Sequence, residues 1–114
     1  FRGIKISDIN GLPNALTIRP DQRITVVGGT GRNIVLVRYT YYGAQDNTFG
    51  SGGIVIDSVP SGLTFVNSIA YYPIGSKTIV LFNGPDGRVA LTRYNYDGSR
   101  DRLFSGDGVL TFSF

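Results

Sequence analysis

Aspartates are the residues of this chain best suited to chemistry. They are its only acidic side chains, eight in number, and the sequence contains no Glu, His or Cys. Ser–His–Asp and Cys–His arrangements and thiolate zinc sites are therefore excluded. Paired aspartates can act as general acid and base, but all eight lie in or beside segments rich in Gly, Pro and Asn, where they serve as turn residues. The sequence predicts a non-enzyme that needs no cofactor.

One aspartate-containing segment has alternating oxygen ligands. In NYDGSRD, Asn95, Asp97, Ser99 and Asp101 occupy every second position, a spacing faintly similar to that of calcium loops. Such loops are longer and end in a Glu, which this chain lacks. A turn is favoured and no metal is expected, although calcium binding by Asn95, Asp97 and Asp101 stays open.

The same segment belongs to an internal repeat. Residues 38–53 (RYTYYGAQDNTFGSGG) and 93–108 (RYNYDGSRDRLFSGDG) match at seven of sixteen positions with an offset of 55. The match includes Arg38, Gly43, Asp46 and Phe49 in the first copy, and Arg93, Gly98, Asp101 and Phe104 in the second. A period of this length is typical of stacked or radial repeat architectures.

The repeated residues have a structural interpretation as a corner between two strands. The Asp-Gly pair at 97–98 favours a tight turn with positive φ. Arg93 shares a strand face with Leu91, so its guanidinium needs a partner, and Asp101 suits that role. Phe104 would fill the apolar space beneath. We predict that Arg93–Asp101 and Arg38–Asp46 form equivalent ion pairs.

The rest of the sequence favours strands. Helix formers are scarce, whereas Gly, Tyr, Phe, Val, Ile and Thr are plentiful. Four short strands are predicted per repeat, followed by a ninth at the end: 3–7, 16–19, 23–28, 34–41, then 53–57, 69–72, 77–82, 88–96, and 108–114. RITVVGG and NIVLVRY are apolar on both faces, as in sheets stacked between other sheets. We expect an all-β fold of two four-stranded β-propeller-blade-like repeats plus one extra terminal strand, with a β-sandwich as the alternative.

Two stretches carry a family resemblance. VRYTYYGAQDNTFGSGGIV and LTRYNYDGSRDRLFSGDGVLT resemble the delta-60 repeat of bacterial proteins, in which Arg-Tyr or Arg-Leu is followed by an Asn-x-Asp-Gly-Ser-x-Asp core and a Phe-Gly pair. Together the two copies cover nearly the whole chain. This chain departs from the pattern at Tyr42, Gln22 and Ser105. The resemblance implies propeller-like blades in surface or secreted proteins with no agreed activity, and hence an extracellular or cell-surface location.

The repeat boundaries predict self-association. The chain is expected to be one all-β unit with repeats at about 3–52 and 53–107 and a terminal strand at 108–114. Two blades cannot close a propeller of about four to eight blades, so other chains or further repeats must complete the fold. Leu110, Phe112 and Phe114 alternate with Val109, Thr111 and Ser113 and are expected to pack against that neighbour. A structural or assembly protein, forming a filament or ring, is the predicted function.

The alternative function is glycan binding. Exposed tyrosines can stack on sugars, and the candidates are Tyr41, Tyr42, Tyr71, Tyr72 and Tyr96. Other partners are not expected. The net charge of +3 comes from scattered arginines without a basic run, which argues against nucleic acid. No run of about 18 apolar residues is present to span a membrane as a helix.

Overall fold

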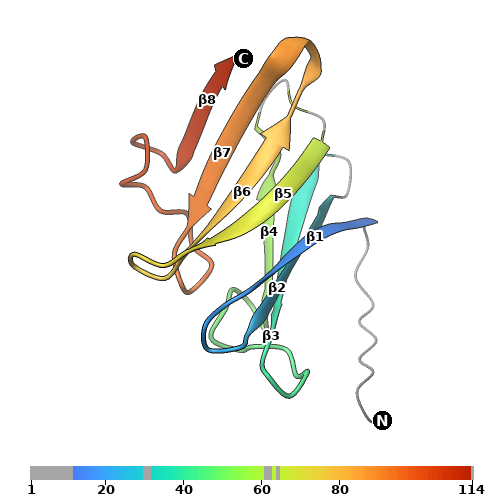
Figure 1. Ribbon diagram of the computed structural model, residues 1–114, viewed down its shortest axis with the longest axis vertical. Helices are drawn as coiled ribbons and strands as arrows, with labels where there is room; N and C mark the ends of the chain where they lie inside the picture. Colours follow the sequence, from blue (N-terminus) through green and yellow to red (C-terminus); the bar gives the residue numbers. More distant parts are fainter. Residues whose placement is uncertain (1–11, 30–31, 61–62, 64, 114) are drawn as a thin grey trace.

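The computed structural model describes residues 12–29, 32–60, 63 and 65–113. This part of the chain forms two antiparallel four-stranded sheets (Figure 1) and contains no α-helix, which confirms the all-β prediction. The first sheet contains β1 (Leu12–Ile18), β2 (Ile24–Gly29), β3 (Asn33–Tyr39) and β4 (Ile54–Ser58). The second contains β5 (Phe65–Tyr72), β6 (Lys77–Asn83), β7 (Arg88–Tyr94) and β8 (Val109–Ser113). A single 3-10 turn, Pro85–Gly87, joins β6 to β7.

Each sheet is a simple meander in which neighbours along the chain are neighbours in the sheet. Short connections place the first three strands of each sheet side by side, whereas longer corners join β3 to β4 and β7 to β8. Between β6 and β7, for example, Asp86 and Gly87 both have positive φ, at 61° and 73°. An Asp-Gly pair tolerates this conformation and reverses the chain within a few residues.

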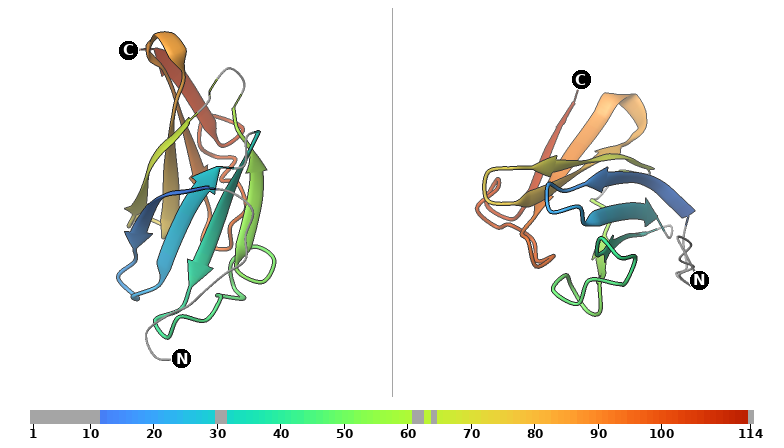
Figure 2. Two further views of the ribbon diagram at one scale, coloured as in Figure 1. Left: turned by 90° about the vertical axis from the view of Figure 1, so that its right-hand side faces the viewer. Right: turned by 60° about the horizontal axis from the view of Figure 1, so that its bottom comes forward.

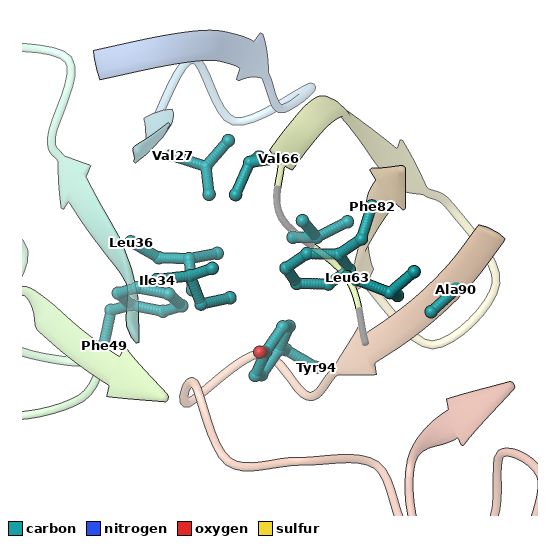
Figure 3. Packing of buried hydrophobic residues seen from close by; sticks show 10 residues of the cluster. Val27, Ile34, Leu36, Phe49, Leu63, Val66, Phe82, Ala90 and Tyr94 are labelled. Atoms are coloured by element: carbon teal, nitrogen blue, oxygen red, sulfur yellow. The ribbon is translucent and has the colours of Figure 1, made fainter. Parts of the chain in front are cut away.

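The two sheets pack face to face, and the apolar residues between them form the core (Figure 3). We call the packed faces the inner faces and the opposite ones the outer faces. The core residues of the first sheet and its corner are Val27, Ile34, Leu36 and Phe49, and those from the second half of the chain are Leu63, Val66, Val80, Phe82, Ala90 and Tyr94. All of them are buried. Burial of this kind is the main favourable contribution to folding.

The sheets approach each other most closely along one edge. There β5 lies against β1 and, less extensively, against β2 (Figure 2). The other strands of each sheet spread away from this edge. Apolar residues on both faces of β3 fit this layered arrangement, since Ile34 and Leu36 point into the core while Val35 and Val37 lie on the outer face.

The boundaries of the two sheets along the chain differ from those of the repeats expected from the sequence. The strand expected at 53–57 is β4, which pairs with β3 and completes the first sheet. The terminal segment is β8, which pairs with β7 as the fourth strand of the second sheet, so it is not a surplus strand. The physical reason is the corner at 40–53, which returns the chain antiparallel to β3. The expected strand at 3–7 lies outside the described residues.

Candidate functional site

The two arginine–aspartate pairs are present, as the repeat predicts. Arg38 Nε donates to Asp46 Oδ2 at 2.8 Å, and Arg93 Nε donates to Asp101 Oδ2 at 2.9 Å. The backbone repeats as well, because the amide of each aspartate donates to the carbonyl of its arginine at 2.8 Å. The amide of Phe49 or Phe104 then donates to the carbonyl of the aspartate at 3.0 Å. The two corners therefore share one conformation, and the prediction is confirmed.

Each aspartate also faces a second cation. Arg23 Nε lies 2.9 Å from Asp46 Oδ2, and Lys77 Nζ lies 3.3 Å from Asp101 Oδ2. The second oxygen of Asp46 accepts from the amide and hydroxyl of Thr48, at 3.0 and 2.6 Å. Burial alone would raise the pKa of Asp46, but these hydrogen bonds and the Arg38 charge outweigh it and lower the pKa to about 2. A carboxylate held ionised in this way serves as a structural anchor rather than a proton carrier.

Aromatic rings cover the guanidinium groups. The Arg38 guanidinium lies 4.4 Å from the ring centre of Phe49 and 4.2 Å from that of Tyr96, which comes from the second half of the chain. Arg93 lies 4.5 Å from Phe104 in the same way. Both phenylalanines therefore form cation–π stacks, and Phe49 also fills space in the core.

A second arginine extends the stack between the sheets. Arg19 lies 4.9 Å from the ring centre of Tyr71 and 4.6 Å from that of Tyr96. Tyr96 therefore contacts two arginines of the first half of the chain. Tyr71 and Tyr96 are half-buried, and their positions are explained by packing.

A polar clamp between the sheets was not predicted from the sequence. Asp57, on β4, accepts from Arg100 Nε and Nη2 at 3.0 and 2.9 Å and from the Tyr94 hydroxyl at 2.8 Å. Burial would raise the pKa of Asp57, but the bonds from Arg100 and Tyr94 hold it below its ordinary value. The available signal was the difference between the copies, because Gln45 stands where the second copy has Arg100.

The predicted binding tyrosines fall into two sets. Tyr71, Tyr72 and Tyr96 are half-buried beside arginines, with Tyr72 5.7 Å from Arg93. Tyr41 and Tyr42 are instead 63% and 91% exposed, and their rings meet edge to face at 5.1 Å. A shallow hollow of about 270 Å³ lies beside Tyr41, with Ile24, Tyr39, Thr40 and Gly43 in its wall. Tyr41 and Tyr42 are the only members of the predicted group that project into solvent to this degree.

Both outer faces carry exposed apolar side chains. On the first sheet, Leu16, Ile18 and Ile56 are exposed beside the buried Val35 and Val37. On the second sheet, the predicted assembly residues Leu110 and Phe112 are 37% and 39% exposed and pair with Leu91 and Val89. The third predicted assembly residue, Phe114, lies outside the described residues. These two faces are candidate interaction surfaces of the described part of the chain.

Comparison with known proteins adds no assignment, because no family model, curated protein or solved structure matches this chain. Within the described ranges, no three His, Cys, Asp or Glu side chains gather closely enough to hold a metal ion. The same ranges contain no helix with the length and apolar character needed to cross a membrane.

Proposed function

We propose that this chain is a non-catalytic structural protein of blade-like β repeats that assembles with further copies of itself through its outer sheet faces, outside the cell. The observation that carries the proposal is the presence of exposed apolar side chains on both outer faces of the sheet pair. Large contiguous apolar patches are uncommon on monomeric soluble proteins and mark interaction sites.

The blade-like interpretation rests on topology. Each sheet is a four-stranded antiparallel meander, and the sheets approach most closely along one edge, at β1 and β5. Propellers arrange about four to eight such sheets around an axis. A pair of sheets would form part of a ring or of an open stack, and the outer faces would meet further sheets in either case.

The aspartates support a structural role. Asp46, Asp57 and Asp101 each bond to an arginine within the sheet pair or its corners. A carboxylate committed to an ion pair is poorly placed for proton transfer, which needs a pKa near the working pH. This supports the proposal that the chain is not an enzyme.

The assembly is tested with substitutions on the outer face of the second sheet. Leu110→Lys and Phe112→Asp should lower the average mass measured by light scattering, because a charge would be buried in the contact. Leu103→Asp is the matched control, since Leu103 is almost fully exposed in the loop before β8. Equal mass for all variants and the parent chain would contradict the proposal. Removing β8 is a poorer test because it exposes β7, a central strand.

The exposed Tyr41–Tyr42 pair favours a second candidate, glycan binding. Two rings projecting beside a hollow offer a platform on which a sugar can stack. A glycan array probed with the parent chain and with Tyr42→Ala tests this function. Binding that is lost in Tyr42→Ala would support it, and an array without signal would remove it.

A further inference from the structure

Resting on the proposed assembly, we propose that the outer face of the second sheet binds the outer face of the first sheet in a second copy of this chain. The contact would repeat, position for position, the interface between the two sheets inside one chain. The outer faces resemble the internal interface in four respects: their apolar residues, their charges, the arginine stack and the backbone.

The first comparison concerns the apolar residues. The repeat and the strand pairing assign each outer-face residue of the second sheet an inner-face equivalent on the first. Leu81 corresponds to Val27, Leu91 to Leu36, and Leu110 to Val55. The inner-face members pack against the second sheet in the core. The outer face of the second sheet therefore carries the same kind of packing surface, partly exposed.

The other half of the internal interface, the inner face of the second sheet, also has an equivalent on the outside of the chain. On its inner face the second sheet presents Val80, Ala90 and Thr92 to the first sheet. The equivalent positions on the outer face of the first sheet are Val26, Val35 and Val37. The chain thus bears both halves of one interface on its outside, which is the requirement for heterologous association.

The second comparison concerns charge. Inside the chain, Asp57 of β4 meets Arg100 of the corner between β7 and β8. On the outer faces the equivalent positions are Phe112 and Gln45. Both members of the internal ion pair are thus replaced by uncharged residues on the outer faces, although Phe112 and Gln45 lie far apart in one chain. A buried charge without its partner is costly, and two outer faces that contact each other satisfy this constraint.

The third comparison concerns the arginine stack. Arg38 lies between Phe49 and Tyr96, and its side chain is 0% exposed. Arg93 stacks on Phe104 likewise but stays 21% exposed. The repeat equivalent of Tyr96 is Tyr41, which is 63% exposed. In the proposed contact, Tyr41 of the second copy covers Arg93 as Tyr96 covers Arg38.

The fourth comparison concerns the backbone. The Gly50 amide donates to the Asp97 carbonyl at 2.7 Å and links the two corners inside the chain. Ser105 takes the place of Gly50 and keeps its left-handed conformation, with φ of 54° against 57°. That conformation is uncommon for a residue with a side chain. It is consistent with a Ser105 amide that donates to the Tyr42 carbonyl of the second copy.

The test recreates the internal ion pair between copies. Phe112→Asp alone buries an unpaired carboxylate and should weaken association at least about tenfold. Gln45→Arg in the same chain supplies the matching base on the other outer face, which only a second copy can bring to it. We expect the double variant to regain most of the lost affinity, measured by sedimentation as a double-mutant cycle. Thermal melts of each variant establish that the chain folds.

Each outcome decides a separate point. Recovery in the double variant supports the proposed register, and Tyr41→Ala should then weaken association independently. Weakening by Phe112→Asp without recovery in the double variant would overturn the register while leaving the proposed assembly intact. Contact between the same outer faces in another register would give that result. A parent chain that does not associate at all would overturn both proposals.

Discussion

Arg38 and Arg93 occupy the same place in their repeats but differ in their surroundings. Both pair with an aspartate and stack on a phenylalanine. Only Arg38 is completely buried, since the second sheet adds Tyr96. One of its terminal nitrogens, Nη1, is buried without a hydrogen-bond partner. Arg38 therefore depends on flat stacking and on Asp46 to offset its loss of hydration.

This contrast predicts different responses to the same substitution. Arg38→Lys keeps the charge but loses the planar stack and the bond to Thr48. We expect the free energy of unfolding to fall by at least about 2 kcal/mol. Arg93→Lys, at the more exposed position, should lower it by about 1 kcal/mol or less. Urea denaturation followed by circular dichroism gives both values, and equal losses would contradict this account.

The low pKa of Asp46 predicts that the free energy of unfolding decreases in acid. Its pKa is about 2 in the folded chain, below the ordinary value of 3.8. A depressed carboxyl pKa contributes stability that is complete above the unfolded pKa and is lost as the pH falls toward the folded one. We expect about 2 kcal/mol of stability to disappear between about pH 4 and pH 2. Asp46→Asn should be less stable at pH 7 and show a shallower loss below pH 4, and an unchanged slope would contradict the prediction.

The sequence was sufficient to predict the residues of the corners, because each Arg–Asp pair is local and occurs twice. It was insufficient for the Asp57 clamp, whose partners Tyr94 and Arg100 lie 37 and 43 residues away, and whose arginine is Gln45 in the other copy. Neither could it separate the exposed tyrosines from the buried ones. Tyr41 and Tyr96 are equivalent in the repeat, and their burial differs because the first sheet covers only Tyr96.

At the scale of elements, the sequence predicts the positions of the strands better than the residues at which they begin and end. β1 and β5 begin at Leu12 and Phe65, four residues before the predicted starts. Each has a bulge in this early part, at Pro13/Ala15 and at Val66/Ser68. Pro and Asn there resemble turn residues, but β1 and β5 are edge strands, which tolerate Pro and bulges. The predicted ends of β3 and β7 were two residues late because the corner begins at position 40 or 95.

Alanine substitutions at two equivalent glycines, one in each corner, test how the corner of the second sheet packs on the first sheet. Gly98 has φ of 91°, and a Cβ added there would lie 2.5 Å from Val55 Cγ2 and 3.1 Å from the Gly50 nitrogen. Gly43 has φ of 84°, and a Cβ there would meet nothing within 4 Å. In both alanine variants, the positive φ should lower the free energy of unfolding by about 1–2 kcal/mol. Gly98→Ala should lose about 1–3 kcal/mol more through overpacking.

Thermal or urea unfolding of dilute protein measures this difference. The comparison is matched because the two turns share sequence position and backbone conformation, so backbone strain cancels. A loss in Gly43→Ala as large as that in Gly98→Ala would show that the corner of the second sheet does not pack on the first.

At the scale of the whole molecule, the proposed assembly is an extension of the internal interface between the two sheets. The two sheets make a contact whose two halves recur on the outer faces, with acid and base replaced together at Phe112 and Gln45. Heterologous contacts of this kind continue until a ring closes or a filament grows. An isologous contact would instead stop at two chains.

The most direct test of the proposed assembly is the mass of the unmodified chain as a function of concentration, measured by light scattering. We predict a weight-average mass that rises with concentration beyond that of two chains and then either levels off at a ring or keeps increasing. A mass that stays at one chain over the whole concentration range, or that stops at two, would contradict the account.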